Sequence, residues 1–141
     1  MKTEYPVIKG EKVYLRPTVE SDLVTFAEWE SRPEVQAFFT MNYDRSLKDV
    51  ASEVHGRAGD PGCADFTVCA LEDDRLLGRV YISAINHHYD SMDISRIYIG
   101  DLSERGKGYG EDALRCALDL GFGRMGMERI TLDYVHGNDS A

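Results

Sequence analysis

Glycine and basic residues alternate in the stretch ERGKGYG, which contains Gly106, Gly108 and Gly110 with Arg105 and Lys107 between them. The glycines carry no Cβ, so they can adopt positive φ angles and let the backbone approach a ligand oxygen closely. A helical pattern begins here, and the N-terminal end of a helix attracts anions through its free N–H groups and its dipole. The stretch therefore predicts a phosphate cradle, although Glu111 and Asp112 in the first helical turn would repel an anion.

Two known phosphate motifs can be compared with this stretch directly. The P-loop pattern GxxxxGK[ST] does not match, because Lys107 is followed by Gly108 and no hydroxyl residue is available for Mg²⁺. The dinucleotide fingerprint matches at Gly108, Gly110 and Ala113, with Asp133 where a ribose-binding acid is expected. That fingerprint normally opens a repeated β-α-β series, whereas here it follows a β meander. An NAD(P)-binding domain therefore remains a remote alternative.

Residues that could ligate a metal ion occur in two other places. The acidic residues 72–74 lie at the tip of an expected hairpin, where a solvated turn is the usual structure. His87 and His88 are adjacent, so on a strand they would point to opposite faces and chelate one ion poorly. The three cysteines include no CxxC pair, which is typical of reduced thiols. No metal site is predicted.

Hydrophobic periodicity predicts the elements that must position the glycine stretch. Strands are expected over residues 7–17 (with a turn at Gly10), 66–71, 76–85, 92–99 and 129–135. Helices are expected from Thr18 to Pro33, from Ser46 to a C-cap at Gly56, and from Gly108 to the break at residues 123–126. The order β-α-α-β-β-β-α-β predicts an α+β domain with a mixed sheet, in which strands 92–99 and 129–135 are parallel neighbours.

The strand over residues 92–99 has an irregular pattern. Met92 and Ile94 alternate with polar residues, but Ile97 and Ile99 stand on the opposite parity. Because a one-residue slip exchanges the two faces of a strand, either a β-bulge lies near Ser95 and Arg96 or the later half is buried on both sides.

Length and composition are typical of a single soluble domain over residues 1–141, since 43% of the residues are hydrophobic and 29% are charged. The formal net charge of -9 opposes binding to nucleic acid. It would attract a cationic ligand, although solubility alone also explains an acidic surface. The sequence shows no signal peptide and no membrane span, so we expect a cytoplasmic protein without a membrane partner.

The glycine stretch also resembles a family signature. Residues 105–110, RGKGYG, are similar to the [RQ]-x-x-G-x-[GA] signature of the GNAT superfamily of acyl-CoA N-acyltransferases. Residues 14–35 resemble the opening of the branch that contains ribosomal-protein N-terminal acetyltransferases and spermidine acetyltransferases, and residues 96–135 resemble its central block. The resemblance covers essentially the whole chain. It implies a GNAT-like α+β fold and transfer of an acetyl group from acetyl-CoA to an amine.

The resemblance also implies roles for particular residues. The pyrophosphate of acetyl-CoA would be held by backbone N–H groups of Arg105, Gly106, Lys107, Gly108, Tyr109 and Gly110. The pantetheine arm would pair with the backbone of Tyr98, Ile99 and Gly100 and contact Asn138. A backbone N–H near Gly100 would donate to the oxyanion, and the bulge would open a slot for the thioester.

The catalytic residues depart from the family pattern. A Glu on the third meander strand commonly serves as the base in this branch, but the matching position is Ser95, and Asp93 is the nearest carboxylate. An ordinary surface carboxylate is an equally good interpretation of Asp93.

The C-terminal pattern departs as well, because the family's proton-donating Tyr and its last strands would follow Asn138. We therefore expect a C-terminally incomplete domain that binds acetyl-CoA weakly and turns over poorly. Its uncovered strand over residues 129–135 would favour a homodimer. A catalytically inactive domain that only binds acyl-CoA is the alternative function.

The acceptor amine is the least defined part. The resemblance places acceptor sites beside the first two helices, where Glu30, Glu34 and Asp44 could face a cation. Ordinary surface charges explain the same residues. A small cationic amine such as a polyamine, an aminoglycoside and a peptide N-terminus all remain possible acceptors.

Overall fold

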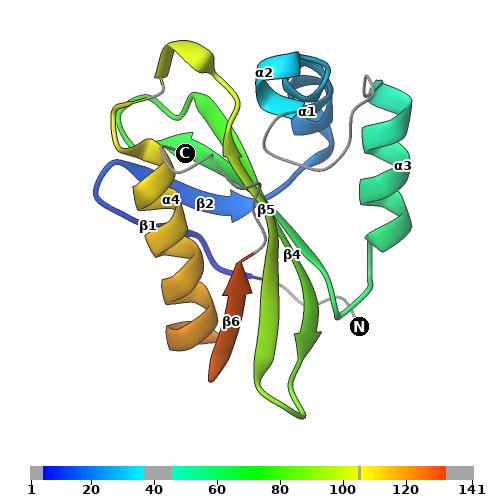
Figure 1. The fold of residues 1–141 in the computed structure, drawn as a ribbon, viewed down its shortest axis with the longest axis vertical. Coiled ribbons are helices and arrows are strands. Elements are labelled where there is room, and N and C mark those ends of the chain that lie inside the picture. The colour runs from blue at the N-terminus through cyan, green and yellow to red at the C-terminus, as the bar shows by residue number, and fades with distance from the viewer. Residues whose placement is uncertain (1–4, 37–45, 105, 133–141) are drawn as a thin grey trace.

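The structure is a computed structural model that describes residues 5–36, 46–104 and 106–132. One mixed sheet organises this part of the chain, with helices on both faces (Figure 1). Its strands are β1 (Ile8–Lys9), β2 (Val13–Pro17), β3 (Ala64–Ala70), β4 (Leu76–Asn86), β5 (Ser91–Ile99) and β6 (Arg129–Leu132). The helices are α1 (Leu23–Glu30), α2 (Pro33–Gln36), α3 (Leu47–Arg57) and α4 (Tyr109–Leu118). Shorter turns are the 3₁₀ segments Glu20–Asp22 and Leu102–Glu104 and the π-helical segment Asp119–Arg124.

The strands lie side by side in chain order, from β1 to β6. Neighbours are antiparallel up to β5, whereas β5 and β6 are parallel, with Ser91 opposite Arg129 and Ile94 opposite Leu132. The predicted α+β class, mixed sheet and parallel pair are therefore confirmed. The last three residues of the predicted strand 129–135 lie outside the described residues.

A β-bulge in β5 explains the change of parity in the sequence. Tyr81 of β4 lies opposite Arg96, but the next residue, Ile82, lies opposite Ile94, so Ser95 is the extra residue. The predicted bulge is confirmed. Because of it, the apolar residues on both sides of the bulge pack on the same face: Met92, Ile94, Ile97 and Ile99.

Two hydrophobic clusters cover the two faces of the sheet. The larger one joins α4, through residues such as Ala113 and Ala117, to the apolar face of the strands. The smaller one joins α1 and α3, through Phe26 and Val50, to Tyr98. In Figure 1 these helices stand on opposite sides of the sheet. Each helical layer therefore packs against its own face of the sheet through a separate hydrophobic cluster.

Helix boundaries differ from the sequence prediction in two places. The first helix, α1, ends at Glu30, shortly before the predicted stop at Pro33. Pro33 is instead the first residue of α2, a position where the missing N–H of proline costs nothing. Gly56 is not a C-cap, since α3 continues to Arg57. The Arg57 guanidinium stacks 3.8 Å from the centre of the Tyr81 ring, a tertiary contact that favours one more helical residue. At its other end, α3 has the predicted capping box, in which the Asp49 N–H donates to Ser46 Oγ at 3.1 Å.

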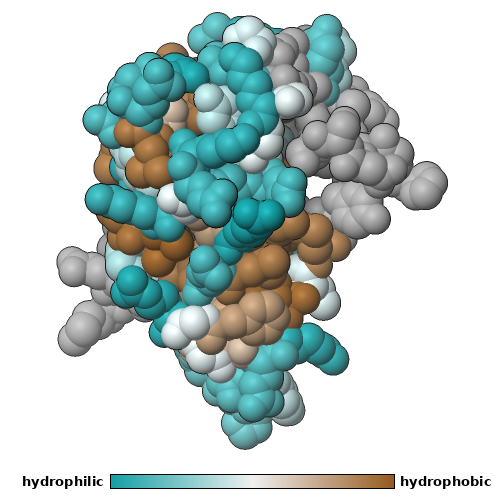
Figure 2. Space-filling view, turned by 90° about the vertical axis from the view of Figure 1, so that its left-hand side faces the viewer, coloured by the Kyte–Doolittle hydropathy of each residue, from teal (hydrophilic) through white to brown (hydrophobic). Residues whose placement is uncertain are grey.

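The outer side of β6 has no strand partner within the described part of the chain. Leu132 of β6 and Phe122 of the preceding segment are both partly exposed. Figure 2, which views the molecule from the α4 side, shows apolar surface lying next to hydrophilic surface. The predicted homodimer through this edge stays a prediction.

Candidate acyl-CoA site

The glycine stretch connects the end of β5 to α4. Gly106 has φ +82° and Gly108 has φ +84°, a left-handed conformation that glycine adopts without strain. Gly108 is the N-cap of α4, and Tyr109 and Gly110 form the first turn of the helix. Backbone N–H groups of this turn have no helical acceptor and can therefore donate to an anion. The geometry fits a phosphate cradle.

The side chains around the stretch carry opposite charges that partly cancel. Lys107 Nζ lies 3.0 Å from Glu104 Oε2, and the pKa of Lys107 is raised mainly by this hydrogen bond. Arg75 Nη2 lies 3.0 Å from the other oxygen of the same carboxylate. Glu104 thus occupies the space between two cations. Arg105 lies outside the described residues.

A lysine that is distant in the sequence contacts the backbone of the glycine stretch. Lys12, in the turn between β1 and β2, donates from Nζ to the carbonyl oxygen of Lys107 at 2.7 Å. Sequence reasoning missed Lys12, because the two residues are 95 positions apart and neither motif nor periodicity relates them.

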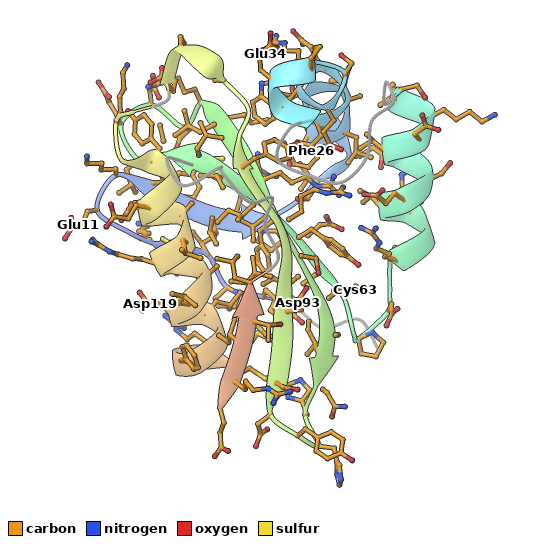
Figure 3. All side chains as sticks on the ribbon, viewed as in Figure 1. Glu11, Phe26, Glu34, Cys63, Asp93 and Asp119 are labelled. Carbon is orange, nitrogen blue, oxygen red and sulfur yellow. The ribbon has the colours of Figure 1, made fainter. Side chains whose placement is uncertain are left out.

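Asp112 fixes the same turn to α4. Its carboxylate accepts N–H groups from Glu11 at 3.2 Å, Lys12 at 2.8 Å and Val13 at 2.9 Å. Figure 3 shows Glu11 beside the first turns of α4. The alternation of apolar and polar residues in this helix predicts an exposed side chain for Asp112, and that prediction is wrong. The residue is buried, and its charge is used to hold the β1–β2 turn.

Neutralising Asp112 is expected to lower stability in a pH-dependent way. Burial alone raises the pKa of Asp112, but the three N–H donors outweigh it, so the pKa lies below its ordinary value. The folded pKa is therefore lower than the unfolded one, near 3.9. The ionised form stabilises the protein above that pH, and this contribution is lost as the pH falls through the folded pKa. We expect Asp112→Asn to cost about 1–3 kcal/mol at pH 7.

Urea unfolding at pH 7 and between about pH 5 and pH 3 measures this effect. The exposed Asp119 is the matched control, since Asp119→Asn removes a carboxylate that no described hydrogen bond uses. Equal stabilities for the two variants at pH 7 would contradict the role of Asp112.

The open edge of β5 can pair with an extended ligand. β6 pairs only with Ser91–Ile94 of β5, so no described strand pairs with the later half on that side. The Gly100 N–H donates to the Leu77 carbonyl of the β4 side at 2.8 Å. In an antiparallel ladder these directions alternate, so the N–H groups of Ile97 and Ile99 point to the open edge.

These backbone directions narrow the predicted pantetheine contacts. Of the predicted pantetheine-binding residues, Ile99 has the required backbone direction, whereas Tyr98 and Gly100 face β4 by the same alternation. The Gly100 N–H is used by Leu77, so it is not the oxyanion donor. Gly100 has a packing role instead, because a Cβ there would lie 2.1 Å from Cδ2 of Trp29. Asn138 lies outside the described residues.

Asp93 and Ser95 lie together on β5, next to the end of the described part of β6. Ser95 Oγ donates to Asp93 Oδ2 at 2.6 Å and lies 2.5 Å from Ser83 Oγ of β4. Thr131 of β6 donates to the other Asp93 oxygen. Figure 3 shows Asp93 in the region where β5 and β6 run side by side. The structure thus brings the two predicted catalytic residues into one hydrogen-bonded group, which can hold and pass a proton.

The two acidic residues proposed to face a substrate have different surroundings. Glu34 is exposed on α2 (Figure 3). Glu30 is fully buried, accepts a hydrogen bond from Tyr98 Oη at 2.6 Å and pairs with Arg79 Nη1 at 2.8 Å. Both interpretations of Glu30, as a carboxylate that faces a cationic substrate and as an ordinary surface charge, are wrong, because Glu30 is buried and Arg79 neutralises it. Asp44 lies outside the described residues.

Glu30 belongs to a larger ionic cluster beneath α1 and α3. Arg79 Nη2 also pairs with Asp65 at 2.8 Å and with Glu53 at 3.3 Å. Arg96, next to the bulge, pairs with Glu53 at 2.8 Å. The cluster therefore connects the bulged strand with both helices of that layer.

A cavity of about 470 Å³ lies at the C-terminal end of α3. Arg57, Asp60, Cys63 and Asp65 contribute to its lining. Asp65 of β3 lies opposite Tyr81 of β4, which lies opposite Arg96 of β5. The lining residue Asp65 is therefore about 10 Å, or two strand spacings, from the bulged strand. Among the described residues, no group of three or more His, Cys, Asp or Glu side chains is placed to hold a metal ion.

Comparison with known proteins identifies the family. The family description "Acetyltransferase (GNAT) domain" matches residues 12–141. The chain belongs to the GNAT acetyltransferase family. No curated protein matches the sequence significantly. As a GNAT domain, the chain is an acyl-CoA-dependent N-acetyltransferase that uses acetyl-CoA.

Solved structures show the same GNAT fold. Spermidine N-acetyltransferase from Vibrio cholerae, in complex with CoA and spermine, has a TM-score of 0.77 and 21% identity over 85% of this chain and 69% of that chain. A domain from Methanocaldococcus jannaschii DSM 2661 has a TM-score of 0.77 and 20% identity over 92% and 82%. A GNAT-family acetyltransferase from Bacillus anthracis has a TM-score of 0.73 and 20% identity over 90% and 72%. No helix in the described part of this GNAT domain is long and apolar enough to span a membrane.

Proposed function

We propose that the chain transfers the acetyl group of acetyl-CoA to the amine of a small cationic acceptor such as a polyamine. The observation that carries the proposal is the alignment of three features along β5. The Asp93–Ser95 pair lies at the bulge, the open edge follows it, and the left-handed glycines precede α4. A proton acceptor, a strand-like binding edge and a phosphate cradle thus follow one another along the chain.

Each feature has a defined role in this proposal. N–H groups of residues 106–110 hold the pyrophosphate, and the backbone of Ile97 and Ile99 pairs with the pantetheine arm. When bound, acetyl-CoA supplies an activated acetyl thioester. Asp93 accepts the proton that the ammonium group of the acceptor must lose before its nitrogen can attack, and the Ser95 hydroxyl can relay it. As the new carbon–nitrogen bond replaces the acyl–sulfur bond, the nitrogen would lose a second proton and CoA would leave as the thiol.

The acceptor class rests on charge and on fold similarity. The net charge of -9 attracts cations. The Vibrio cholerae structure that shares the fold is a spermidine N-acetyltransferase bound to spermine. Glu34, exposed on α2, is the remaining predicted substrate residue that the structure leaves at the surface. We therefore favour a polyamine over an aminoglycoside or a peptide N-terminus.

Acetyl transfer to a polyamine, an aminoglycoside and a short peptide with a free N-terminus tests the proposal, together with calorimetric titration of CoA. We expect transfer to the polyamine with the highest kcat/KM. Asp93→Asn should lower kcat at least tenfold with an unchanged Kd for CoA, because general-base catalysis contributes about 10²–10⁴-fold. Asp119→Asn should change neither quantity.

The other outcomes are also informative. Preferred transfer to the peptide or the aminoglycoside would overturn the acceptor class alone. CoA binding without any transfer would favour a non-catalytic acyl-CoA-binding domain, and NAD(P) binding in place of CoA would favour the dinucleotide alternative.

A further inference from the structure

Two lysines stand at the glycine stretch, but their ammonium groups are placed differently. Lys107, which lies within the signature, pairs with Glu104 at 3.0 Å. Lys12 forms no ion pair with any described carboxylate, and its Nζ would lie 2.9 Å from a Cβ placed on Gly108. Of these two lysines, Lys12 is therefore the one whose charge lies unpaired next to the N-cap of α4, as far as the described residues show.

The position of Lys12 is fixed at two points. Its ammonium group donates to the Lys107 carbonyl oxygen at 2.7 Å, and its backbone N–H donates to Asp112 Oδ2 at 2.8 Å. Asp112 belongs to α4, the helix whose N-terminus forms the cradle. Both ends of Lys12 are thus attached to the cradle, so its charge is held there although the side chain is exposed.

The ammonium group retains donors for a ligand. It has three N–H bonds, and the Lys107 carbonyl oxygen uses one of them. A phosphate oxygen at the N-terminus of α4 can accept another in a charge-assisted hydrogen bond, which is stronger than one between neutral groups. Gly106 has open space where a Cβ would stand, and at Gly108 the atoms that such a Cβ would meet belong to the Lys12 side chain itself. An oxygen bound at this backbone would therefore lie beside the Lys12 ammonium group.

We propose that Lys12 is a phosphate-binding residue of the acyl-CoA site and that Asp112 is the positioning residue that holds it. The inference rests on the proposed function, since it names a further residue of the same site. The β1–β2 turn, which contains Lys12, thus helps to bind the phosphate groups of CoA. Lys12 thereby favours phosphate-bearing CoA over pantetheine, which carries no phosphate.

Calorimetric titrations of CoA and of pantetheine test the role of Lys12. Lys12→Met should raise the Kd for CoA about tenfold, the size expected for one hydrogen bond between charged groups. Lys12→Arg, which keeps the charge, should recover most of the affinity. Lys48→Met, an exposed lysine of α3, is the control and should bind as the wild type does. The Kd for pantetheine should be the same in all four proteins.

The salt dependence of the Kd provides a second readout, because a lost phosphate contact reduces the dependence on ionic strength. The inference is overturned if the wild type binds CoA and Lys12→Met binds it as tightly as Lys48→Met does. It is also overturned if Lys12→Met weakens pantetheine as much as CoA. If the wild type itself binds no CoA, the proposed function fails, which is a distinguishable result.

Discussion

Replacing Arg79 by methionine is expected to lower the free energy of unfolding by about 3–5 kcal/mol, because it leaves buried carboxylates without their counter-ion. Arg79 is fully buried and contacts Glu30, Asp65 and Glu53 at 2.8, 2.8 and 3.3 Å. Methionine preserves much of the apolar stem but none of the charge. The acidic side chains would then either take up protons or draw water beneath α1.

Urea unfolding of Arg79→Met measures this loss, and Arg115→Met is the matched control. Arg115 forms an exposed pair with Glu111 at 3.0 Å within α4, and such pairs contribute about 0.2–0.5 kcal/mol. In the double variant with Glu30→Met as well, part of the loss should be recovered, since one unpaired carboxylate is removed. Similar stabilities for Arg79→Met and Arg115→Met would show that the buried cluster is not essential.

Replacing Gly78 by alanine should destabilise the protein by about 3 kcal/mol, the upper end of the usual cost of overpacking, because the neighbouring atoms are backbone. A Cβ at Gly78 would lie 2.0 Å from the carbonyl oxygen of Tyr98, so β4 and β5 would have to move apart. Gly78 lies opposite Ile99, whose backbone faces the open edge. CoA affinity should therefore fall together with stability.

The matched control is the same substitution in α3. Gly56 has open space where a Cβ would stand, and alanine is the better helix former by up to about 1 kcal/mol. Gly56→Ala should therefore leave stability unchanged or raise it, with CoA binding intact. Chemical denaturation and CoA titration distinguish the two variants. A Gly78→Ala protein as stable as the wild type would be incompatible with the close contact of the two strands.

Local patterns predict the sheet and its irregularity well. The parity change between Ile94 and Ile97 predicts either a bulge near Ser95 and Arg96 or burial on both faces, and the structure shows both, with Ser95 as the extra residue and Tyr98 and Ile99 buried on opposite faces. Likewise, the spacing of the glycines before a helical pattern is sufficient to predict left-handed backbone at the N-terminus of α4. The bulge and the left-handed glycines depend on residues that are close together in the sequence, so a local pattern can predict them.

Buried charges were the main error, although the sequence contains a signal for them. Glu30 follows Leu23 and Phe26 at i+7 and i+4, which places it on the buried face of α1. Arg79 interrupts an otherwise apolar strand and is the obvious partner. Asp112 precedes the buried Cys116 by four residues in the same way. The helical spacing of these acidic residues therefore predicts burial better than their charge predicts exposure.

Lys12 could not be found in this manner. Its contact with the glycine stretch depends on how the β1–β2 turn lies against α4, and that arrangement results from the whole sheet rather than from a local pattern. The direction of the N–H groups in β5 is similar, since it depends on pairing with β4. Long-range geometry of this kind becomes visible only when the chain is folded.

Because the β1–β2 turn is attached to α4, the glycine signature alone does not contain all the residues of the proposed phosphate site. Transplanting residues 104–118 into another scaffold would carry over the glycines and the helix. It would leave behind the turn that Asp112 holds and the ammonium group that reaches the Lys107 carbonyl. Because the two distant segments share these contacts, substitutions in one are expected to affect the other, and a homologue without an acid at position 112 is expected to have a different β1–β2 turn.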